Sequence, residues 1–313
     1  MKICLFGIKS STTRLLNYLI KKKIKIDTLI VLDPNKSSSV QISGHDNKII
    51  VRAKELGVNC FFAKTYSLKS DTDKKFFKTE SFDLGLCTNW QRLIPKDVLN
   101  CFRFGVFGWH GSGFKFPNGR GRSPINWSIR LGLNEIFHNC FKYSAGADDG
   151  DIYETSKFTI QNDDYIADIQ EKAVKHICES TIRLINDIKE NKLKLTSQVG
   201  HPFISFPALN EESGMLYPNH LSVKNARNIV RSCSHPFPGA YVVLSKYAAK
   251  IRIWKAEILT TKPKQIQIEK GCVFFSDTEL VVGFCDGILK LTQYEIEIEK
   301  EYKLPINTNL RCD

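Results

Sequence analysis

Short apolar runs that alternate with amphipathic segments constrain the fold of this chain more than any other feature. Residues 3–7 form an apolar run closed by Gly7, and residues 13–20 follow with their leucines at helical spacing. The same alternation continues with apolar runs at residues 26–32, 60–62 and 82–87 and a helical pattern at residues 48–56. Strand–helix alternation of this kind predicts a parallel sheet with helices on both faces.

The second half of the chain follows a different pattern. The pattern at residues 162–191 predicts one long helix, because two aspartates stand in its first turn and apolar residues recur at helical spacing. Residues 223–233 predict a short helix. Alternating runs then stand at residues 241–244, 251–254, 273–275, 280–284 and 288–291. Short strands at this spacing predict a small open barrel.

The predicted fold class is therefore α/β, with a Rossmann-like parallel sheet, helices on both faces, and a small, mainly β, open-barrel (OB-like) C-terminal domain. A chain of 313 residues exceeds what one core usually organises. We expect a catalytic domain at residues 1–200, a linker with three prolines and little periodicity at 201–219, and the C-terminal domain at 220–313. The first turn lacks the G-x-G-x-x-G spacing, which disfavours a nicotinamide cofactor.

The net charge indicates which ligands suit the chain, and the cysteines indicate its cellular compartment. The net charge of +12 suits an anionic ligand such as a nucleotide sugar, a polyglutamyl tail or a nucleic acid, although scattered solvated lysines explain it equally well. The ten cysteines include no C-x-x-C pair, and the N-terminal apolar run stops at Gly7, so we expect no metal cluster and no signal peptide. We accordingly expect a cytoplasmic protein without a membrane span.

Residues 105–152 carry the side chains best suited to chemistry. His110 stands just past the end of an apolar run, at the edge where parallel sheets bind ligands. A glycine- and arginine-rich loop follows at residues 115–123, and an acidic turn at 146–152 precedes another expected strand. A histidine, a loop and a carboxylate can thus converge at one rim.

The motifs of this segment resemble those of the formyltransferases that use 10-formyltetrahydrofolate. The similarity lies in H-x-S, then R-G-x-x-P-I-N-W, then an acidic D-x-G-D-I turn. Residues 235–241 and 250–254 are similar to the P-x-P-G-A-x and K-x-x-I-W signature of the family's C-terminal domain. The combination of H-G-S, R-G-R-x-P and N-W looks nearest to formyltransferases of the UDP-4-amino-4-deoxy-L-arabinose type.

This resemblance implies an enzyme that moves a formyl group from 10-formyltetrahydrofolate, a co-substrate, to the amine of a nucleotide-linked amino sugar. The resemblance also implies a role in lipopolysaccharide or surface-glycan biosynthesis. Two alternatives stay open: a methionyl-tRNA formyltransferase and a non-catalytic folate or nucleotide-sugar binding protein. Residues 214–217 lack the aspartate and tryptophan that tRNA enzymes usually carry, which disfavours nucleic acid as partner. A homodimer is compatible with the sequence, which does not determine the oligomeric state.

By the same resemblance, His110 matches the family's catalytic histidine and Asp148 its catalytic aspartate. Formyl transfer requires a site that takes a proton from the amine, stabilises a tetrahedral oxyanion and protonates the leaving nitrogen. Histidine has an ordinary pKa of about 6.5 and serves proton transfer in both directions. Asp148 is expected to hold the ring tautomer and to favour the imidazolium.

The chain departs from the family pattern at Gly108. The family carries N-x-H at this strand, with the asparagine donating to the formyl oxygen, whereas this chain reads Gly108-Trp109-His110. Losing one such donor typically costs about 10²–10³ in rate. A backbone N–H at Gly108, a bound water or the side chain of Asn89 are the candidate replacements.

Two loops complete the expected site. The loop after the strand ending at Cys87 receives the pteridine ring in the family, and its folate-binding candidates are Asn89, Arg92 and Leu93. The loop after His110 is two residues longer than the common family form but keeps its residue types. We expect its residues to position the histidine and line the cleft, with Arg120 in a structural role; they are Ser112, Phe116, Pro117, Arg120 and Gly121.

Overall fold

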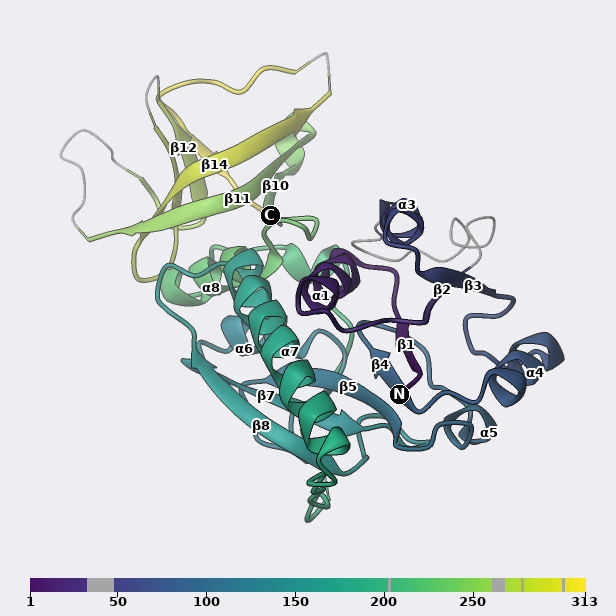
Figure 1. Cartoon of the computed structure of the whole chain (residues 1–313). Coiled ribbons are helices and arrows are strands. Elements are labelled where there is room, and N and C mark those ends of the chain that lie inside the picture. Colours follow the sequence, from purple (N-terminus) through teal and green to yellow (C-terminus); the bar gives the residue numbers. More distant parts are fainter. Residues whose placement is uncertain (33–47, 202–203, 261–267, 277–278, 300–301) are drawn as a thin grey trace. The chain divides into compact units, whose positions relative to one another are not determined.

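The computed structural model describes residues 1–32, 48–201, 204–260, 268–276, 279–299 and 302–313, which form two compact units (Figure 1). The first unit comprises Met1–Gly121, Phe137–Phe158 and Gln170–Ser205. The second comprises Arg122–Ile136, Thr159–Ile169 and Phe206–Asp313. The expected domain limits at residues 200 and 219 stay a prediction, and residues 202–203 of the expected linker lie outside the described residues.

The first unit is built on a seven-stranded sheet with the order β3-β2-β1-β4-β5-β7-β8. The strands from β3 to β5 pair in parallel, and β7 pairs antiparallel with β5. The strands are β1 (Ile3–Phe6), β2 (Thr28–Leu32), β3 (Asn59–Ala63), β4 (Leu84–Cys87), β5 (Gly105–Ser112), β7 (Glu135–Lys142) and β8 (Ile152–Thr159). The predicted Rossmann-like sheet is confirmed, with an antiparallel strand that the sequence pattern did not indicate.

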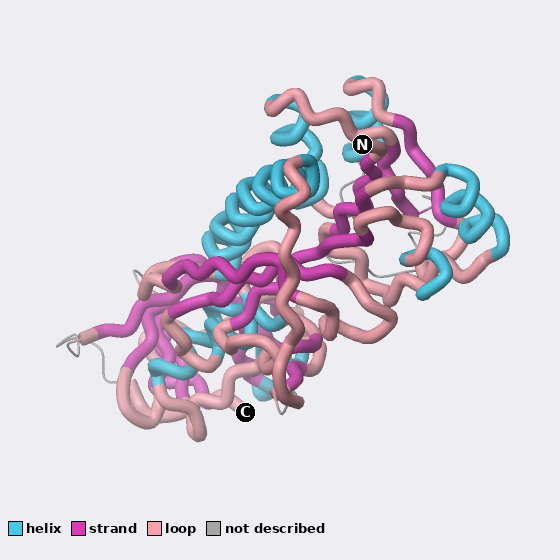
Figure 2. The backbone as a smooth tube through the Cα atoms, turned by 60° about the horizontal axis from the view of Figure 1, so that its bottom comes forward, coloured by secondary structure: helices cyan, strands magenta, loops and turns pink. Residues whose placement is uncertain are grey.

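Helices cover this sheet, and the longest of them, α7, runs along the strands in both Figure 1 and Figure 2. The amphipathic pattern of α1 buries Leu15, Leu16 and Leu19. The side chain of Ser70 caps α4 by accepting the backbone N–H of Asp73. The helices are α1 (Ser10–Lys21), α3 (Lys48–Glu55), α4 (Asp71–Glu80), α5 (Lys96–Leu99) and α7 (Ile166–Lys189).

Strand β5 presents alternate residues to opposite faces of the sheet. Trp109 faces α7, because its indole N–H donates to the Ser180 hydroxyl at 2.7 Å. Gly108 and His110 therefore lie on the other face, where they stand opposite Phe141 and Asn139 of β7. The strand period thus separates the residues that anchor the long helix from those that carry the expected chemistry.

The second unit contains a six-stranded antiparallel sheet with the order β10-β11-β14-β13-β12-β15. The predicted mainly β C-terminal part is confirmed, and α8 (Val223–Cys233) has the bounds expected from the sequence. The strands are β10 (Ala240–Leu244), β11 (Ala249–Leu259), β12 (Cys272–Phe275), β13 (Leu280–Gly283), β14 (Ile288–Ile298) and β15 (Asn309–Arg311).

The described residues also include several shorter elements. They are β6 (Arg120–Gly121), which pairs with β9 (Ser205–Phe206), together with α6 (Pro124–Arg130), η1 (Glu212–Gly214) and η2 (Ser245–Tyr247). Within the described ranges, no helix combines the length and apolar character that crossing a membrane requires.

A buried histidine on β7 makes stability depend on pH. His138 is 4% exposed, and burial together with the nearby His176 and His110 lowers its pKa to about 3. The unfolded chain takes up this proton near pH 6.5 and the folded chain does not, so acidification favours unfolding. Between pH 7 and pH 5 we expect this group to remove about 2 kcal/mol from the free energy of unfolding. Denaturant titrations at pH 7 and pH 5 should show this loss of unfolding free energy for the wild type but not for His138→Phe. An equal loss in both proteins would contradict the assignment.

Candidate active site

His110 is held in a defined orientation at the rim of the sheet. Its side chain is 7% exposed, and its Nε2 lies 2.7 Å from the carbonyl oxygen of Gly119. A carbonyl oxygen only accepts hydrogen bonds, so Nε2 is the ring nitrogen that carries the proton. The second nitrogen, Nδ1, is thereby left to exchange a proton with whatever faces it.

The loop after β5 approaches His110 closely because of a glycine. Gly119 has a φ of +74°, and a Cβ at this position would lie 2.1 Å from the hydroxyl oxygen of the buried Ser112. Only glycine lets the backbone bend here and place its carbonyl on the imidazole. The ring of Phe116 lies 5.1 Å from the His110 ring and covers it with an apolar wall, and Pro117 follows it in the loop.

Asp148 faces the other nitrogen of the imidazole. Its Oδ2 lies 3.5 Å from Nδ1 of His110 and 3.5 Å from the backbone nitrogen of Gly121, and its side chain is 26% exposed. At this distance the carboxylate forms an ion pair with an imidazolium, while a neutral ring makes no short hydrogen bond to it. The expectation that Asp148 holds the ring tautomer stays a prediction; the Gly119 carbonyl contacts the ring from the opposite side and favours the form with the proton on Nε2.

A side-chain amide ties the Asp148 turn to Arg120. The Gln198 amide N–H₂ donates to the carbonyl oxygens of Asp148 at 2.9 Å and Gly150 at 2.8 Å. Its amide oxygen accepts from the Arg120 guanidinium at 2.6 Å. Sequence reasoning missed Gln198, because it stands in a segment without periodicity and acts only through contacts distant along the chain.

The departure at Gly108 has a structural counterpart. A Cβ built on Gly108 would lie 2.2–2.5 Å from the tip of the Tyr143 ring, including 2.4 Å from its hydroxyl oxygen. Tyr143 thus occupies the space into which a side chain at position 108 would extend. Sequence reasoning missed Tyr143 as well, although a glycine in place of an expected asparagine was a signal that another group fills the gap.

The folate-binding candidates lie on the loop after β4. The Asn89 amide donates to the Ser11 hydroxyl at 2.7 Å, and the Arg92 guanidinium stacks over Tyr66 at 5.3 Å. Leu93 is 54% exposed, so the rim offers an apolar surface of the kind that the face of a pteridine ring needs. The contact with Ser11 directs the Asn89 amide toward α1 and weakens its candidacy as the replacement for the missing asparagine.

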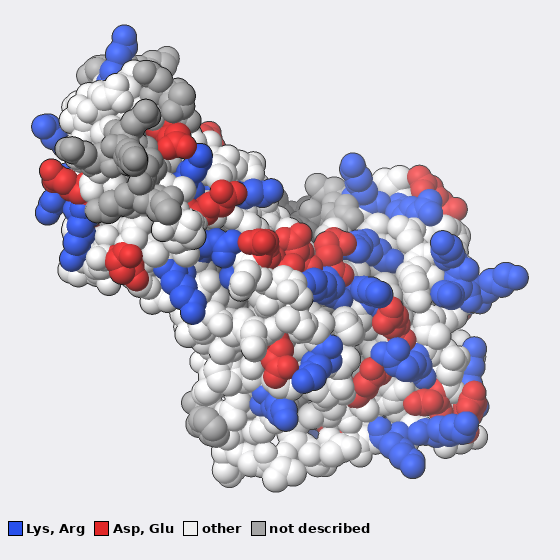
Figure 3. Space-filling view, turned by 90° about the vertical axis from the view of Figure 1, so that its left-hand side faces the viewer, with Lys and Arg blue, Asp and Glu red and all other residues white. Residues whose placement is uncertain are grey.

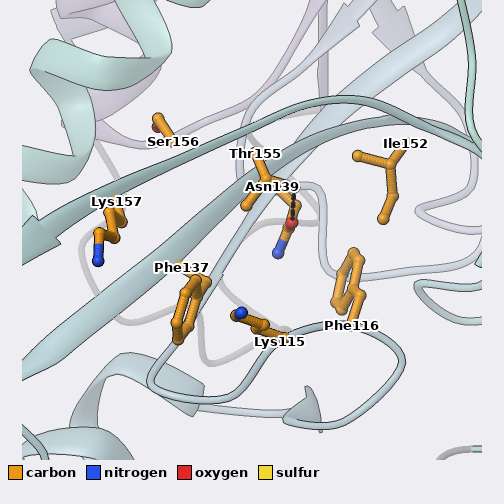
Figure 4. A pocket seen from close by; sticks show the side chains of 8 residues that line it. All are labelled: Lys115, Phe116, Phe137, Asn139, Ile152, Thr155, Ser156 and Lys157. Atoms are coloured by element: carbon orange, nitrogen blue, oxygen red, sulfur yellow. Dashed lines mark hydrogen bonds between the residues drawn. The ribbon is translucent and has the colours of Figure 1, made fainter.

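A pocket of about 380 Å³ adjoins His110 on the same face of the sheet. Asn139, opposite His110 in the strand register, is 1% exposed; its Oδ1 accepts from Thr155 at 2.7 Å, and its Nδ2 has no partner among the described residues. In Figure 4 this nitrogen points into the space between Phe137, Lys115 and Phe116. The lining residues are Lys115, Phe116, Phe137, Asn139, Ile152, Thr155, Ser156 and Lys157.

Comparison with known proteins places this geometry in a family. A formyl transferase model matches residues 1–183, and a formyl transferase C-terminal domain model matches residues 220–309. The methionyl-tRNA formyltransferase of Thermodesulfovibrio yellowstonii is 24% identical over 300 residues, which is 95% of this chain and 92% of that protein.

Solved structures share the fold. An N-formyltransferase from Helicobacter canadensis, solved with folinic acid and dTDP-3-aminofucose, has a TM-score of 0.67 at 14% identity and covers 94% of this chain and 100% of its own. HypX from Aquifex aeolicus, solved with tetrahydrofolic acid, has a TM-score of 0.64 at 17% identity over 96% of this chain. This chain spans 45% of the length of HypX. The two family models together cover most of the sequence, and the chain belongs to the formyl transferase family, enzymes that transfer formyl groups.

Proposed function

We propose that this enzyme moves the formyl group of 10-formyltetrahydrofolate to the amine of a nucleotide-linked amino sugar. The observation that carries the proposal is the arrangement around His110, whose Nε2 is fixed on Gly119 while Nδ1 faces Asp148. One nitrogen of the imidazole is thus reserved for proton transfer, beside a carboxylate that stabilises its charged form.

In this mechanism the neutral amine attacks the formyl carbon and its proton passes to Nδ1 of His110. The carboxylate of Asp148, 3.5 Å away, stabilises the resulting imidazolium. The C–N bond to the folate then breaks, and Nδ1–H returns the proton to the leaving nitrogen. The products are an N-formyl amide and tetrahydrofolate, and His110 regains its starting state.

The co-substrate supplies the activated formyl group and leaves as tetrahydrofolate. Leu93 and Arg92 at the carboxyl end of β4 would hold its pteridine ring, with an apolar surface against the ring face and a guanidinium at its polar edge. Phe116 covers the imidazole and limits the access of water that would hydrolyse the formyl group instead.

The residues that line the pocket beside His110 suit a small anionic acceptor substrate. Lys115 and Lys157 supply positive charge, and Phe116 and Phe137 supply flat apolar surfaces, which together suit a nucleotide. The Helicobacter canadensis neighbour, solved with a dTDP-linked amino sugar, supports the same acceptor class. On the face shown in Figure 3, Lys and Arg mix with Asp and Glu instead of forming the basic stripe typical of tRNA binding.

Methionyl-tRNA is the second candidate acceptor, because the relative from Thermodesulfovibrio yellowstonii is a methionyl-tRNA formyltransferase that matches nearly end to end. Both candidates are tested by one panel. The enzyme is incubated with 10-formyltetrahydrofolate and either aminodeoxy sugar nucleotides or methionyl-tRNA, and products are weighed by mass spectrometry.

We expect a formyl mass gain on at least one sugar nucleotide, with release of tetrahydrofolate that requires the amine. If only methionyl-tRNA is formylated, and the affinity for tRNA falls steeply as the salt concentration rises, the acceptor is tRNA and not a sugar nucleotide. Failure to formylate any amine, together with retained folate binding, would leave the binding-protein alternative.

A further inference from the structure

We propose that the phenol of Tyr143 donates the hydrogen bond that stabilises the oxyanion of the tetrahedral intermediate. The inference rests on the proposed formyl transfer and adds a catalytic residue to it. When the amine attacks, the formyl oxygen becomes negatively charged and needs a preorganised donor about 2.7–3.1 Å away. Gly108, the position at which the family pattern places that donor, has no side chain.

The position of Tyr143 answers this need. Its hydroxyl oxygen lies 2.4 Å from where a Cβ on Gly108 would stand, so its O–H occupies the volume of the missing side chain. Tyr143 follows Phe141 by two residues along the same chain segment, and Phe141 stands opposite Gly108 in the register. Alternation along the strands places Gly108, His110 and Tyr143 on one face of the sheet.

The phenol is fixed in place by its surroundings. The backbone N–H of Tyr143 donates to the Val106 carbonyl at 2.7 Å, and its ring lies 5.2 Å from that of Phe141. Phe141 in turn packs edge-on against Phe116, the residue that covers His110. A continuous set of packed rings therefore connects the hydroxyl to the imidazole and holds both rigidly.

The phenol also keeps its proton. Burial, followed by the nearby Cys87 and then Asp148, raises the pKa of Tyr143 well above its ordinary value. Burial also raises the pKa of Cys87 to about 12, so the hydrogen-bonding partner of Tyr143 is a neutral thiol, which is a weak acceptor. The O–H can therefore turn from sulfur to a developing oxyanion at little cost, and a charge-assisted bond is the stronger of the two.

The first test removes the hydroxyl and keeps the ring. Tyr143→Phe is expected to lower kcat for formyl transfer by about 10²–10³-fold while the KM values for both substrates change by less than about threefold. Tyr153→Phe is the matched control, because it loses a phenol bonded to Asp187 at 2.7 Å on the face of the sheet that packs against α7. That control should retain kcat within about threefold of the wild type.

A rescue experiment separates a chemical role from a structural one. Tyr143→Val clears the space beside Gly108, and Gly108→Asn in that background places an amide donor there. We expect the double variant to recover at least about tenfold in kcat over Tyr143→Val. Gly108→Asn alone should be impaired, because its Cβ would collide with the Tyr143 ring.

If the kcat of Tyr143→Phe stays within about threefold of the wild-type value, the role of the phenol is overturned and the proposed function is left intact. A double variant no faster than Tyr143→Val, despite native thermal stability, would also overturn it. Absence of formyl transfer by the wild type would refute the proposed function itself, and the assignment of Tyr143 with it.

Discussion

His110→Ala is expected to lower kcat for formyl transfer by about 10³–10⁴-fold, which corresponds to about 4–5.5 kcal/mol in the activation free energy. The imidazole takes the proton of the amine and returns one to the leaving nitrogen, so its loss affects both halves of the reaction. The affinity for folate should change little, because the folate-binding candidates lie on the loop after β4, where Arg92 packs over Tyr66 and Leu93 is exposed.

The matched control is His176→Ala. His176 belongs to α7, and its ring stacks on Phe158 at 5.0 Å, on the face of the sheet opposite His110. It should retain kcat within about threefold. Equal losses in the two histidine variants would mean that the effect reports folding; wild-type turnover in His110→Ala would remove this residue from the mechanism.

Asp148→Asn is expected to lower kcat by about 10²–10⁴-fold, because the amide cannot stabilise an imidazolium at Nδ1 of His110. Asparagine is the informative replacement. Asp148 has a φ of +54°, a left-handed conformation that asparagine adopts readily and alanine does not. Thermal unfolding should accordingly show Asp148→Asn to be more stable than Asp148→Ala.

The adjacent Asp149 provides the control for this variant. Its carboxylate accepts a hydrogen bond from the Ser144 hydroxyl and shapes the same turn. Asp149→Asn should keep kcat within about threefold of the wild type. A larger loss of kcat in Asp149→Asn than in Asp148→Asn would show that Asp149, and not Asp148, is the catalytic carboxylate.

The long periodic segments of the fold could be predicted from the sequence. Residues 223–233 match α8, and the helix expected at 162–191 is Ile166–Lys189. The N-terminal difference has a local cause, because the Asp164 carboxylate accepts the backbone N–H of Gln161 in a turn before the helix begins.

Strand β7 was missed because it breaks the usual pattern. It buries two polar side chains, His138 and Asn139, so neither an apolar run nor a clean alternation marks it. Its pairing with β5 brings Asn139 opposite His110, and the residue after β7, Tyr143, lies against Gly108. The groups predicted around His110 were those with motifs, whereas Tyr143 and Gln198 reach the site only through tertiary contacts.

The central claim is that His110, paired with Asp148, passes a formyl group directly from folate to an amine. A single-turnover experiment with ¹³C-formyl-labelled 10-formyltetrahydrofolate and the best amino sugar nucleotide of the panel tests it most directly. For the wild type we predict the label in the product amide, with one tetrahydrofolate released per amide. For His110→Ala we predict the same folate binding and a transfer rate lower by about 10³-fold or more. Label recovered as free formate, or transfer by His110→Ala at the wild-type rate, would contradict the account.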